Sequence, residues 1–338
     1  MSKMRNKYIL VGILFIVLFF AVGCGANAEE VLINGEAQMI YTPIAGFSGI
    51  MDILVIPMAG LMWLLGRSIA VKNYALVILF ATIIVRSIAW PIYGKTNDMS
   101  LKMSLLAPEQ AKIEKKYAGR TDQESQQRKS MEMMQLYKKY KVSFSGCFMP
   151  FIQMPIFLAF FETLRRVPYT IVSWLDACGG SIEIGDKVIT TGDLLFDFGF
   201  LNTKIFGIDL FKGVDGSLFD HPTWQTIGIW ILALLVGLTQ LGMQILTNRR
   251  QKKQKDQMNE GIPEYRKPQQ TEQQKSMETS MKIMMYAMPV TMVIFIIQSP
   301  AALGWYWFVG NIYTAFQNYI SHARSAKRLE KLKEKFSK

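Results

Sequence analysis

The stretch from Asn73 to Lys95 constrains the fold more than any other part of this sequence. Its letters read NYALVILFATIIVRSIAWPIYGK, mostly apolar residues with Arg86 among them. A helix of about twenty apolar residues spans the roughly 30 Å hydrocarbon core of a bilayer. A charge inside such a helix is costly, and proteins usually retain one only with a partner, with water or for a function. The sequence therefore predicts a membrane-spanning helix in which Arg86 has a specific role.

Composition supports a membrane protein. Of the 338 residues, 50% are hydrophobic, and the apolar residues gather in blocks between segments that hold most of the charge. This block pattern is typical of transmembrane proteins. The net charge of +12 comes mainly from the linking segments, and it indicates loops that face anionic lipid before it indicates a nucleic-acid partner. With three cysteines and two histidines scattered along the chain, we expect no disulfide framework, no metal site and no cofactor.

The N-terminus has the features of a bacterial lipoprotein. A basic start, the apolar run Ile9 to Val22 and a small-residue exit make residues 1–23 a secretory signal peptide. The letters AVGC, which end at Cys24, resemble a lipobox. That resemblance implies cleavage before Cys24 and attachment of lipid, such as palmitate, to this residue, which leaves residues 24–49 as an external N-terminal segment. The alternative is an uncleaved anchor helix with an incidental cysteine.

The distribution of Lys and Arg predicts the topology, because cytoplasmic loops carry the excess of positive charge. Residues 50–69 are apolar but interrupted by Pro57 and Gly60, so we expect an amphipathic helix at the outer surface there. The alternative, an extra span, would reverse every later orientation. The expected fold is an all-α membrane protein with five transmembrane helices. In chain order, we expect a first span at 73–94, a cytoplasmic helical hairpin at 95–142, a second span at 143–166, an external loop at 167–223, a third span at 224–246, a cytoplasmic loop at 247–282, fourth and fifth spans at 283–298 and 301–320, and a basic cytoplasmic tail at 321–338.

The two cytoplasmic segments differ in pattern. In the first, apolar residues recur among Gln, Glu and Lys, and Gly119-Arg120-Thr121-Asp122 interrupts them. This pattern predicts two amphipathic helices joined by a turn. The second, Gln251 to Gln274, is rich in Gln and Lys, contains two prolines and has few apolar residues, so we expect it to be flexible.

Four polar side chains fall inside four different predicted spans. At 1.5 Å per helical residue, Arg86 and Gln240 lie about 20 Å and 24 Å from the outer ends of their spans, and Asn311 about 15 Å. Gln153 lies about 15 Å above the inner end. In one interpretation Arg86 reaches toward the headgroups and the amides hold helices together. In the other, Arg86 and the three amides line a wet groove that opens to the cytoplasm. No acidic residue of the spans is placed to neutralise the charge of Arg86.

Three motifs resemble one known family. The stretch NYALVILFATIIVRSIAWP, the segment SFSGCFMPFIQMPIFLAFFETLRR (143–166) and GWYWFVGNIYTAFQNYI (304–320) occur in that order around the basic hairpin. Together they are similar to the YidC family of membrane protein insertases, in the five-span lipoprotein form of Gram-positive bacteria. The resemblance covers the chain from about residue 50 to the basic tail.

The resemblance implies insertion and folding of membrane proteins in the cell membrane, alone or beside the Sec translocon, without ATP hydrolysis and so without enzyme activity. It implies a hydrophilic groove centred on Arg86, with Gln240 and Trp307 among its lining residues, although Gln244 one turn further on is an alternative to Gln240. Gln153 with Pro155 matches the second-span motif. The hairpin would recruit nascent membrane proteins, and the basic tail is similar to tails that contact the ribosome.

The physical chemistry of insertion agrees with these roles. A polar segment that crosses hydrocarbon leaves backbone groups unsatisfied, at several kcal/mol each, and a groove with water and donors shortens that path. We expect Arg86 and Asn311 to lie in the groove, and the apolar helix of the inserting protein to leave along the second and fifth spans. Pro155, Phe157 and Phe308 would form this exit surface.

Other function classes fit the sequence less well. A transporter or channel for small solutes or ions would also bury polar residues, but it usually shows internal repeats and ionisable relays. An intramembrane protease needs catalytic residues within the spans, and both histidines, His221 and His322, fall outside them. The basic tail could contact RNA phosphates, but positive-inside charge explains the same residues.

Overall fold

The computed structural model describes residues 28–33, 36–47, 49–117, 119–120, 122–140, 149–184, 187–215, 221–259 and 286–337. It describes only the backbone over 28–39, 92–105, 107–108, 111, 149–154, 251, 254–259 and 322–337. The expected signal peptide, Cys24 and most of the second cytoplasmic loop lie outside the described residues. The chain divides into two compact units, residues 1–81 with 152–211 and residues 82–151 with 212–338. The two units are described one at a time.

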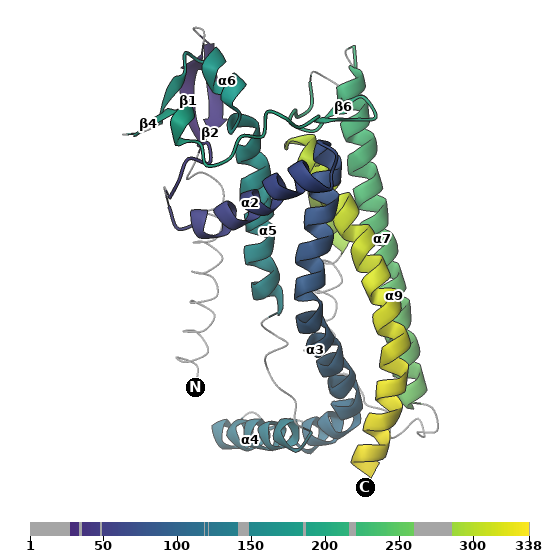
Figure 1. Cartoon of the computed structure of the whole chain (residues 1–338). Coiled ribbons are helices and arrows are strands. Elements are labelled where there is room, and N and C mark those ends of the chain that lie inside the picture. The colour runs from purple at the N-terminus through teal and green to yellow at the C-terminus, as the bar shows by residue number, and fades with distance from the viewer. Residues whose placement is uncertain are drawn as a thin grey trace. The chain divides into compact units, whose positions relative to one another are not determined.

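The first unit contains a small lobe of strands (Figure 1). Strand β1 (Ala28–Ile33) pairs antiparallel with β2 (Glu36–Tyr41), and β3 (Ser181–Ile184) pairs antiparallel with β4 (Lys187–Thr190). A single two-stranded hairpin is marginally stable in water, so the lobe depends on a shared core. That core includes helix α6 (Val172–Ala177) and consists of Ile40, Leu175, Ile182, Ile184 and Ile189.

Helix α2 (Asp52–Ser68) follows the lobe and has two different faces. Val55, Met62 and Leu65 are buried, whereas Ile53 and Leu64 are exposed. Helix α2 occupies most of the segment 50–69, where a helix was expected, and it exposes apolar side chains along one side.

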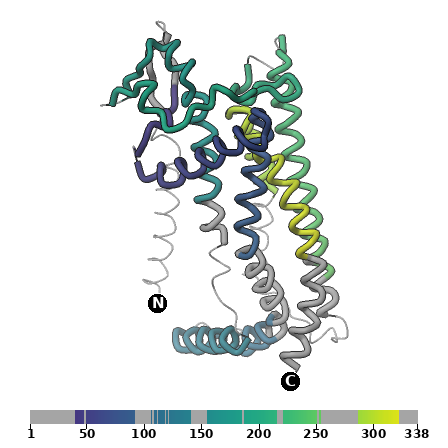
Figure 2. The backbone as a smooth tube through the Cα atoms, in the orientation of Figure 1, coloured from purple at the N-terminus to yellow at the C-terminus, as the bar shows by residue number. Residues whose placement is uncertain are grey.

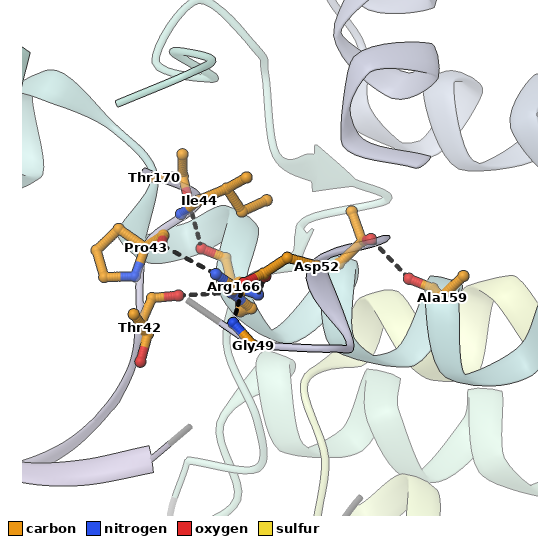
Figure 3. A network of polar contacts seen from close by, with 9 residues as sticks. Thr42, Pro43, Ile44, Gly49, Asp52, Ala159, Arg166 and Thr170 are labelled. Carbon is orange, nitrogen blue, oxygen red and sulfur yellow. Dashed lines mark hydrogen bonds and ion pairs between the residues drawn. The ribbon is translucent and has the colours of Figure 1, made fainter. Parts of the chain in front are cut away.

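A buried ion pair joins the start of α2 to the end of α5 (Met149–Arg166) (Figure 3). The guanidinium of Arg166 donates to Oδ1 of Asp52, and both side chains are inaccessible to solvent. Arg166 also donates to the carbonyl oxygens of Thr42 at 2.7 Å and Pro43 at 3.1 Å, and Asp52 accepts from the backbone of Gly49 at 2.9 Å. A buried charge is tolerated when it is paired and hydrogen-bonded, and Arg166 satisfies both conditions.

Two short elements complete the first unit. The 3₁₀ turn η2 (Val167–Tyr169) continues α5, and the pair β5 (Lys204–Ile205) and β6 (Ile208–Asp209) forms a third antiparallel ladder. The backbone of Asn202 binds Lys72 and Tyr74 on either side of Asn73, at the point where α3 begins.

The second unit is helical. Its helices are α3 (Tyr74–Lys116), whose first turns belong to the first unit, α4 (Gln123–Lys139), α7 (Trp224–Asn259), the helix Tyr286–Ile297 and α9 (Ala301–Ser337).

Helices α7 and α9 begin at the same short segment and run side by side (Figure 2). The backbone N–H of Ala301 donates to Lys212 at 2.9 Å, and Thr226 donates to the carbonyl of Asp215 at 2.5 Å. Because both N-termini are held there, the two helices are parallel.

Glycine allows the helix Tyr286–Ile297 to pack closely against both. A Cβ at Gly237 of α7 would lie 2.8 Å from Val293, and a Cβ at Gly304 of α9 would lie 2.9 Å from Ile296. Small residues at such contacts bring helix backbones together, as in many membrane proteins.

The C-terminal half of α3 and helix α4 form a hairpin. Asp122 caps α4 by accepting from the N–H of Ser125 at 2.8 Å. Lys116 at the end of α3 and Tyr117 directly after it both donate to Glu132 of α4, at 2.6 Å and 2.9 Å. The hydrogen bonds from Lys116 and Tyr117 lower the pKa of Glu132, and the same contact raises the pKa of Lys116. Leu106, Leu136 and Tyr140 form a small apolar core between the helices.

The structure is mostly helical, as expected, but the expectation of an all-α fold is wrong in detail. Three two-stranded sheets lie within the segments 24–49 and 167–223, which were expected to be external. β-Branched and apolar residues alternate along β3 with residues that face solvent, and this period of two is the strand signal that the sequence interpretation did not use.

Helix boundaries also differ from the expected segments. Helix α3 continues without a break from the expected first span into the hairpin, α7 continues to Asn259 within a loop expected to be flexible, and α9 continues through the basic tail. Charged and amide side chains such as Lys, Gln and Glu are good helix formers. A helix therefore has no reason to end where the chain leaves the hydrocarbon.

Within the described residues, two helices are long and apolar enough to cross a bilayer, Tyr74–Pro91 and Trp224–Arg250. The helix Tyr286–Ile297 is apolar but shorter, and at 1.5 Å per residue it is about 18 Å long. The tryptophan, tyrosine, asparagine and glutamine residues of α9 lower its mean hydropathy.

We predict that Arg166→Met destabilises the first unit by about 3–5 kcal/mol, because it leaves the Asp52 carboxylate buried without its counter-charge. Thermal unfolding in detergent, followed by near-UV circular dichroism, measures the change. The control is Arg128→Met, which removes an exposed ion pair with Glu124 and should cost at most about 1 kcal/mol. Equal effects of the two substitutions would contradict the structural role of Arg166.

We predict that the hairpin opens in acid. The lowered pKa of Glu132 means that its contribution is present above its unfolded pKa and is lost as pH falls through the folded value, and Asp122 behaves in the same way. Because the pKa of Lys116 is raised, its contribution to the stability of the hairpin is lost only as pH rises through that raised value, in the alkaline range. Spin labels at Lys112→Cys and Ser130→Cys should report a broader distance distribution below pH 4. Glu132→Gln should leave only the smaller change due to Asp122, and an unchanged transition would refute the assignment.

Candidate functional site

The side chain of Arg86 lies between α3 and α9. Its Nη1 donates to Oγ1 of Thr314 at 2.6 Å, and Thr314 in turn donates to the carbonyl of Gly310 at 2.8 Å. Residues 310 and 314 are one helical turn apart, so they lie on one face of α9. The expected groove arginine is therefore held against a defined position of α9.

Gly310 makes room for the guanidinium. A Cβ at this position would lie 2.6 Å from Nη2 and 3.2 Å from Cζ of Arg86. Any other residue at 310 would displace the charged group, because real Cβ contacts are longer than this. The fixed position of Arg86 therefore requires glycine here.

A second contact beside the arginine strengthens the junction of α3 with α9. The hydroxyl groups of Ser87 and Tyr313 share a hydrogen bond of 2.8 Å. The ring of Tyr313 meets that of Trp90 edge to face, with centroids 6.2 Å apart, a favourable geometry for aromatic pairs. Side chains from two adjacent turns of each helix thus fix the two helices in register.

The charge of Arg86 is not neutralised within the described part of the chain. Among those residues no carboxylate lies within ion-pair distance of it, and its Nε is buried without a hydrogen-bond partner. Arg166 differs in this respect, because it binds a carboxylate and two carbonyl groups. The arginine in the predicted groove retains donor capacity that the described residues do not use.

The side chain of Asn311 contacts α7. Its amide nitrogen donates to Oγ1 of Thr239 at 3.0 Å and to the carbonyl of Val236 at 3.3 Å, both on α7. Asn311 thus connects α9 to α7, which is the role of an intramembrane amide that holds helices together.

The two candidate amides on α7 are Gln240 and, one turn further on, Gln244. Both side chains are partly exposed. The Nε2 atom of Gln244 is nevertheless buried without a hydrogen-bond partner among the described residues. Seven residues separate Gln244 from Gly237, which faces the helix Tyr286–Ile297, so Gln244 lies on the side of α7 toward that helix.

Aromatic residues occupy the first turns of α9. Trp307 packs against Phe295 with ring centroids 5.5 Å apart, and Phe308 packs against Trp305 at 5.9 Å. The contact of Trp307 with Phe295 joins α9 to the helix Tyr286–Ile297, whereas Trp305 and Phe308 both belong to α9. Trp307 and Phe308 are partly exposed.

The remaining predicted residues belong to α5 in the first unit. Pro155 is exposed inside the helix, and Phe157 stacks on Phe161 with centroids 5.7 Å apart. The side chain of Gln153 lies outside the described residues.

Sequence reasoning missed several residues that the structure brings together. Gly310 and Gln317 were not singled out, although a glycine one turn before Thr314 in an apolar helix is a signal of close approach. The pairing of Asp52 with Arg166 joins residues 114 positions apart, and no local pattern indicates it.

Comparison with known proteins identifies the family. A family model described as 60Kd inner membrane protein matches residues 66–328. The chain belongs to this family. The resemblance seen in the three motifs is therefore confirmed, and the site described above lies within the matched region.

Several relatives of the 60Kd inner membrane protein family bear the name membrane protein insertase. YidC 2 of Bacillus anthracis is 28% identical over 250 residues, which cover 74% of this chain and 72% of the relative. YidC of Alkalihalophilus pseudofirmus is 25% identical over 338 residues, covering 98% of this chain and 100% of the relative. YidC 1 of Halalkalibacterium halodurans is 24% identical over 324 residues, which cover 94% of this chain and 91% of the relative.

We predict that Gly310→Ala impairs function by moving Arg86. The new methyl group would break the contact of Arg86 with Thr314, a hydrogen bond from a charged group worth about 1.5–3 kcal/mol. The flexible arginine can move, so the helices should still pack. Growth of a strain depleted of its own family member tests function, and thermal unfolding in detergent tests packing.

Gly242→Ala is the matched control, because a Cβ there meets nothing within 4 Å and alanine favours helix by about 1 kcal/mol. Gly242→Ala should support growth fully. Full growth with Gly310→Ala would show that the position of Arg86 has no functional role.

Proposed function

We propose that this protein is a membrane protein insertase and folding chaperone of the bacterial cell membrane, which works alone or with the Sec translocon and without nucleotide hydrolysis. The observation that carries the proposal is Arg86, a cation fixed between two helices by Thr314 and Gly310 but paired with no carboxylate among the described residues. The names of the relatives point to the same activity. The alternative of a solute transporter or channel finds no support in the comparisons.

The charge of Arg86 explains how a passive protein could accelerate insertion. A polar segment that enters hydrocarbon loses hydrogen bonds with water, at several kcal/mol for each unsatisfied backbone group. A guanidinium with unused N–H donors supplies such bonds inside the bilayer and attracts acidic groups most strongly. The expected groove, with Gln153, Gln240 and Trp307 beside Arg86, would shorten the dry part of the path.

The route out of the groove follows from the apolar residues. Pro155, Phe157 and Phe308 would guide the hydrophobic helix of the inserting protein toward lipid, because these side chains offer it contacts as apolar as the lipid itself. Asn311 would act on α7 and α9, and its contact with Thr239 would keep this wall of the groove in place.

The proposal includes the expected topology. Five spans, with 24–49 and 167–223 outside and 95–142, 247–282 and 321–338 inside, account for the distribution of charge. A lipid on Cys24 would attach the N-terminus to the outer leaflet. The exposed apolar side of α2 would lie on that leaflet, as amphipathic helices do.

The cytoplasmic partners are proposed from charge and shape. The hairpin of α3 and α4 exposes Met131 and Met134 among basic residues. Flexible methionines adapt to varied apolar surfaces, so nascent membrane proteins could bind there. The basic segments could also contact ribosomal RNA through their lysines and arginines.

We predict that Arg86→Ala lowers insertion at least about tenfold for a client with an acidic N-terminal segment, the equivalent of about 1.4 kcal/mol. Arg86→Lys should retain most activity if charge matters more than guanidinium geometry. Purified protein in liposomes, given a short single-span client, measures insertion as protection from external protease.

The same liposomes should show no flux of ions or small solutes. Flux without insertion would favour a transporter, and equal insertion by the wild type and Arg86→Ala would exclude the proposed role of the charge. Arg128→Met, in the exposed part of the hairpin, is the control for a lost cation far from the groove and should insert normally.

A further inference from the structure

Gln317 lies on the face of α9 that contacts Arg86. It follows Gly310 by seven residues and Thr314 by three, and these spacings place all three side chains on one side of the helix. Only 5% of Gln317 is exposed, and its Nε2 is buried without a hydrogen-bond partner in the described structure. The sequence interpretation assigned no role to this residue.

An unpaired buried amide has no structural advantage at this position. Buried polar groups in proteins are almost always hydrogen-bonded, and exceptions need an explanation. A leucine or methionine would fill the same space without leaving a donor unsatisfied. The amide of Gln317 therefore indicates an acceptor that the described residues do not supply.

The chemistry of that acceptor follows from its neighbours. The two atoms without a partner on this face, Nε2 of Gln317 and Nε of Arg86, are both N–H donors. Gln317 lies about 4.5 Å along the helix axis from Thr314, which binds Arg86. The missing partner is therefore an acceptor oxygen, and every residue of an inserting chain carries one in its backbone carbonyl group, whatever its side chain.

We infer that Gln317 is a further binding residue of the insertase groove, which donates a hydrogen bond to backbone carbonyl groups of the inserting segment as it passes Arg86. This inference rests on the proposed function. It divides the work between the two residues: Arg86 binds acidic side chains, and Gln317 binds the backbone regardless of sequence. A neutral donor is suited to carbonyls, because it holds them without the strong attraction that a charge exerts.

The test is Gln317→Met, which keeps the length of the side chain and removes the donor. Insertion into liposomes should fall about fivefold, the value of one ordinary hydrogen bond. The loss should be the same for a client with an acidic segment and for one in which Asn and Gln replace its Asp and Glu. Arg86→Ala should instead affect mainly the acidic client. The unfolding midpoint of Gln317→Met should be unchanged or higher.

The control is Gln298→Met, the same substitution at an exposed position before α9, which should change neither insertion nor stability. Normal insertion by Gln317→Met would overturn the inference, since the amide would then bind water only. A loss confined to the acidic client would assign Gln317 to carboxylates and also overturn it, as would a fall in stability that matches the loss of insertion. If the wild type itself inserts nothing, the proposed function fails, and this outcome is distinct from the others.

Discussion

The contact of Arg86 with α9 is the interaction on which the second unit depends. Thr314 and Gly310 receive the guanidinium, and the hydroxyls of Ser87 and Tyr313 meet beside it. One turn earlier on α9, Asn311 binds α7. α9 therefore holds both neighbours through polar contacts at adjacent levels. In lipid such contacts replace the hydrophobic effect, which does not drive helices together there. The arginine thus has a structural role in addition to the role expected from its charge.

The sequence could predict the depth of these residues but not their direction. Arg86 is thirteen residues past Asn73, and Thr314 is thirteen past Ala301, so both lie about 20 Å along their helices by the fixed helical rise. Their contact agrees with that calculation. Which side of a helix meets which neighbour depends on packing, and packing is not encoded locally. For this reason the sequence did not indicate that the amide of Asn311 donates to Thr239 and Val236 of α7. Nε of Arg86, in contrast, has no hydrogen-bond partner among the described residues.

Other features escaped the sequence analysis for different reasons. The spans were expected to end at charged residues, but Lys, Glu and Gln favour helix, and α3 and α9 continue through them. The strands of the first unit are at most six residues long. Strands this short cannot be distinguished by pattern from the many apolar runs of this chain. The family motifs, in contrast, depend on residue identity rather than on spacing. The motifs therefore identified the family, whereas the periodicity of apolar residues indicated only the class of protein.

Arg166 is buried and Arg86 is partly exposed, and the two arginines allow a comparison within one molecule. Arg166 is fully inaccessible and binds Asp52 and two backbone carbonyls, the arrangement that a buried cation requires when it has only a structural role. Arg86 binds one hydroxyl, which leaves its charge uncompensated among the described residues. A threonine and a glycine fix the position of a guanidinium without neutralising it, which a carboxylate could not do. This arrangement supports the role proposed for Arg86, because an internal carboxylate would compete with an acidic client segment for the same donors.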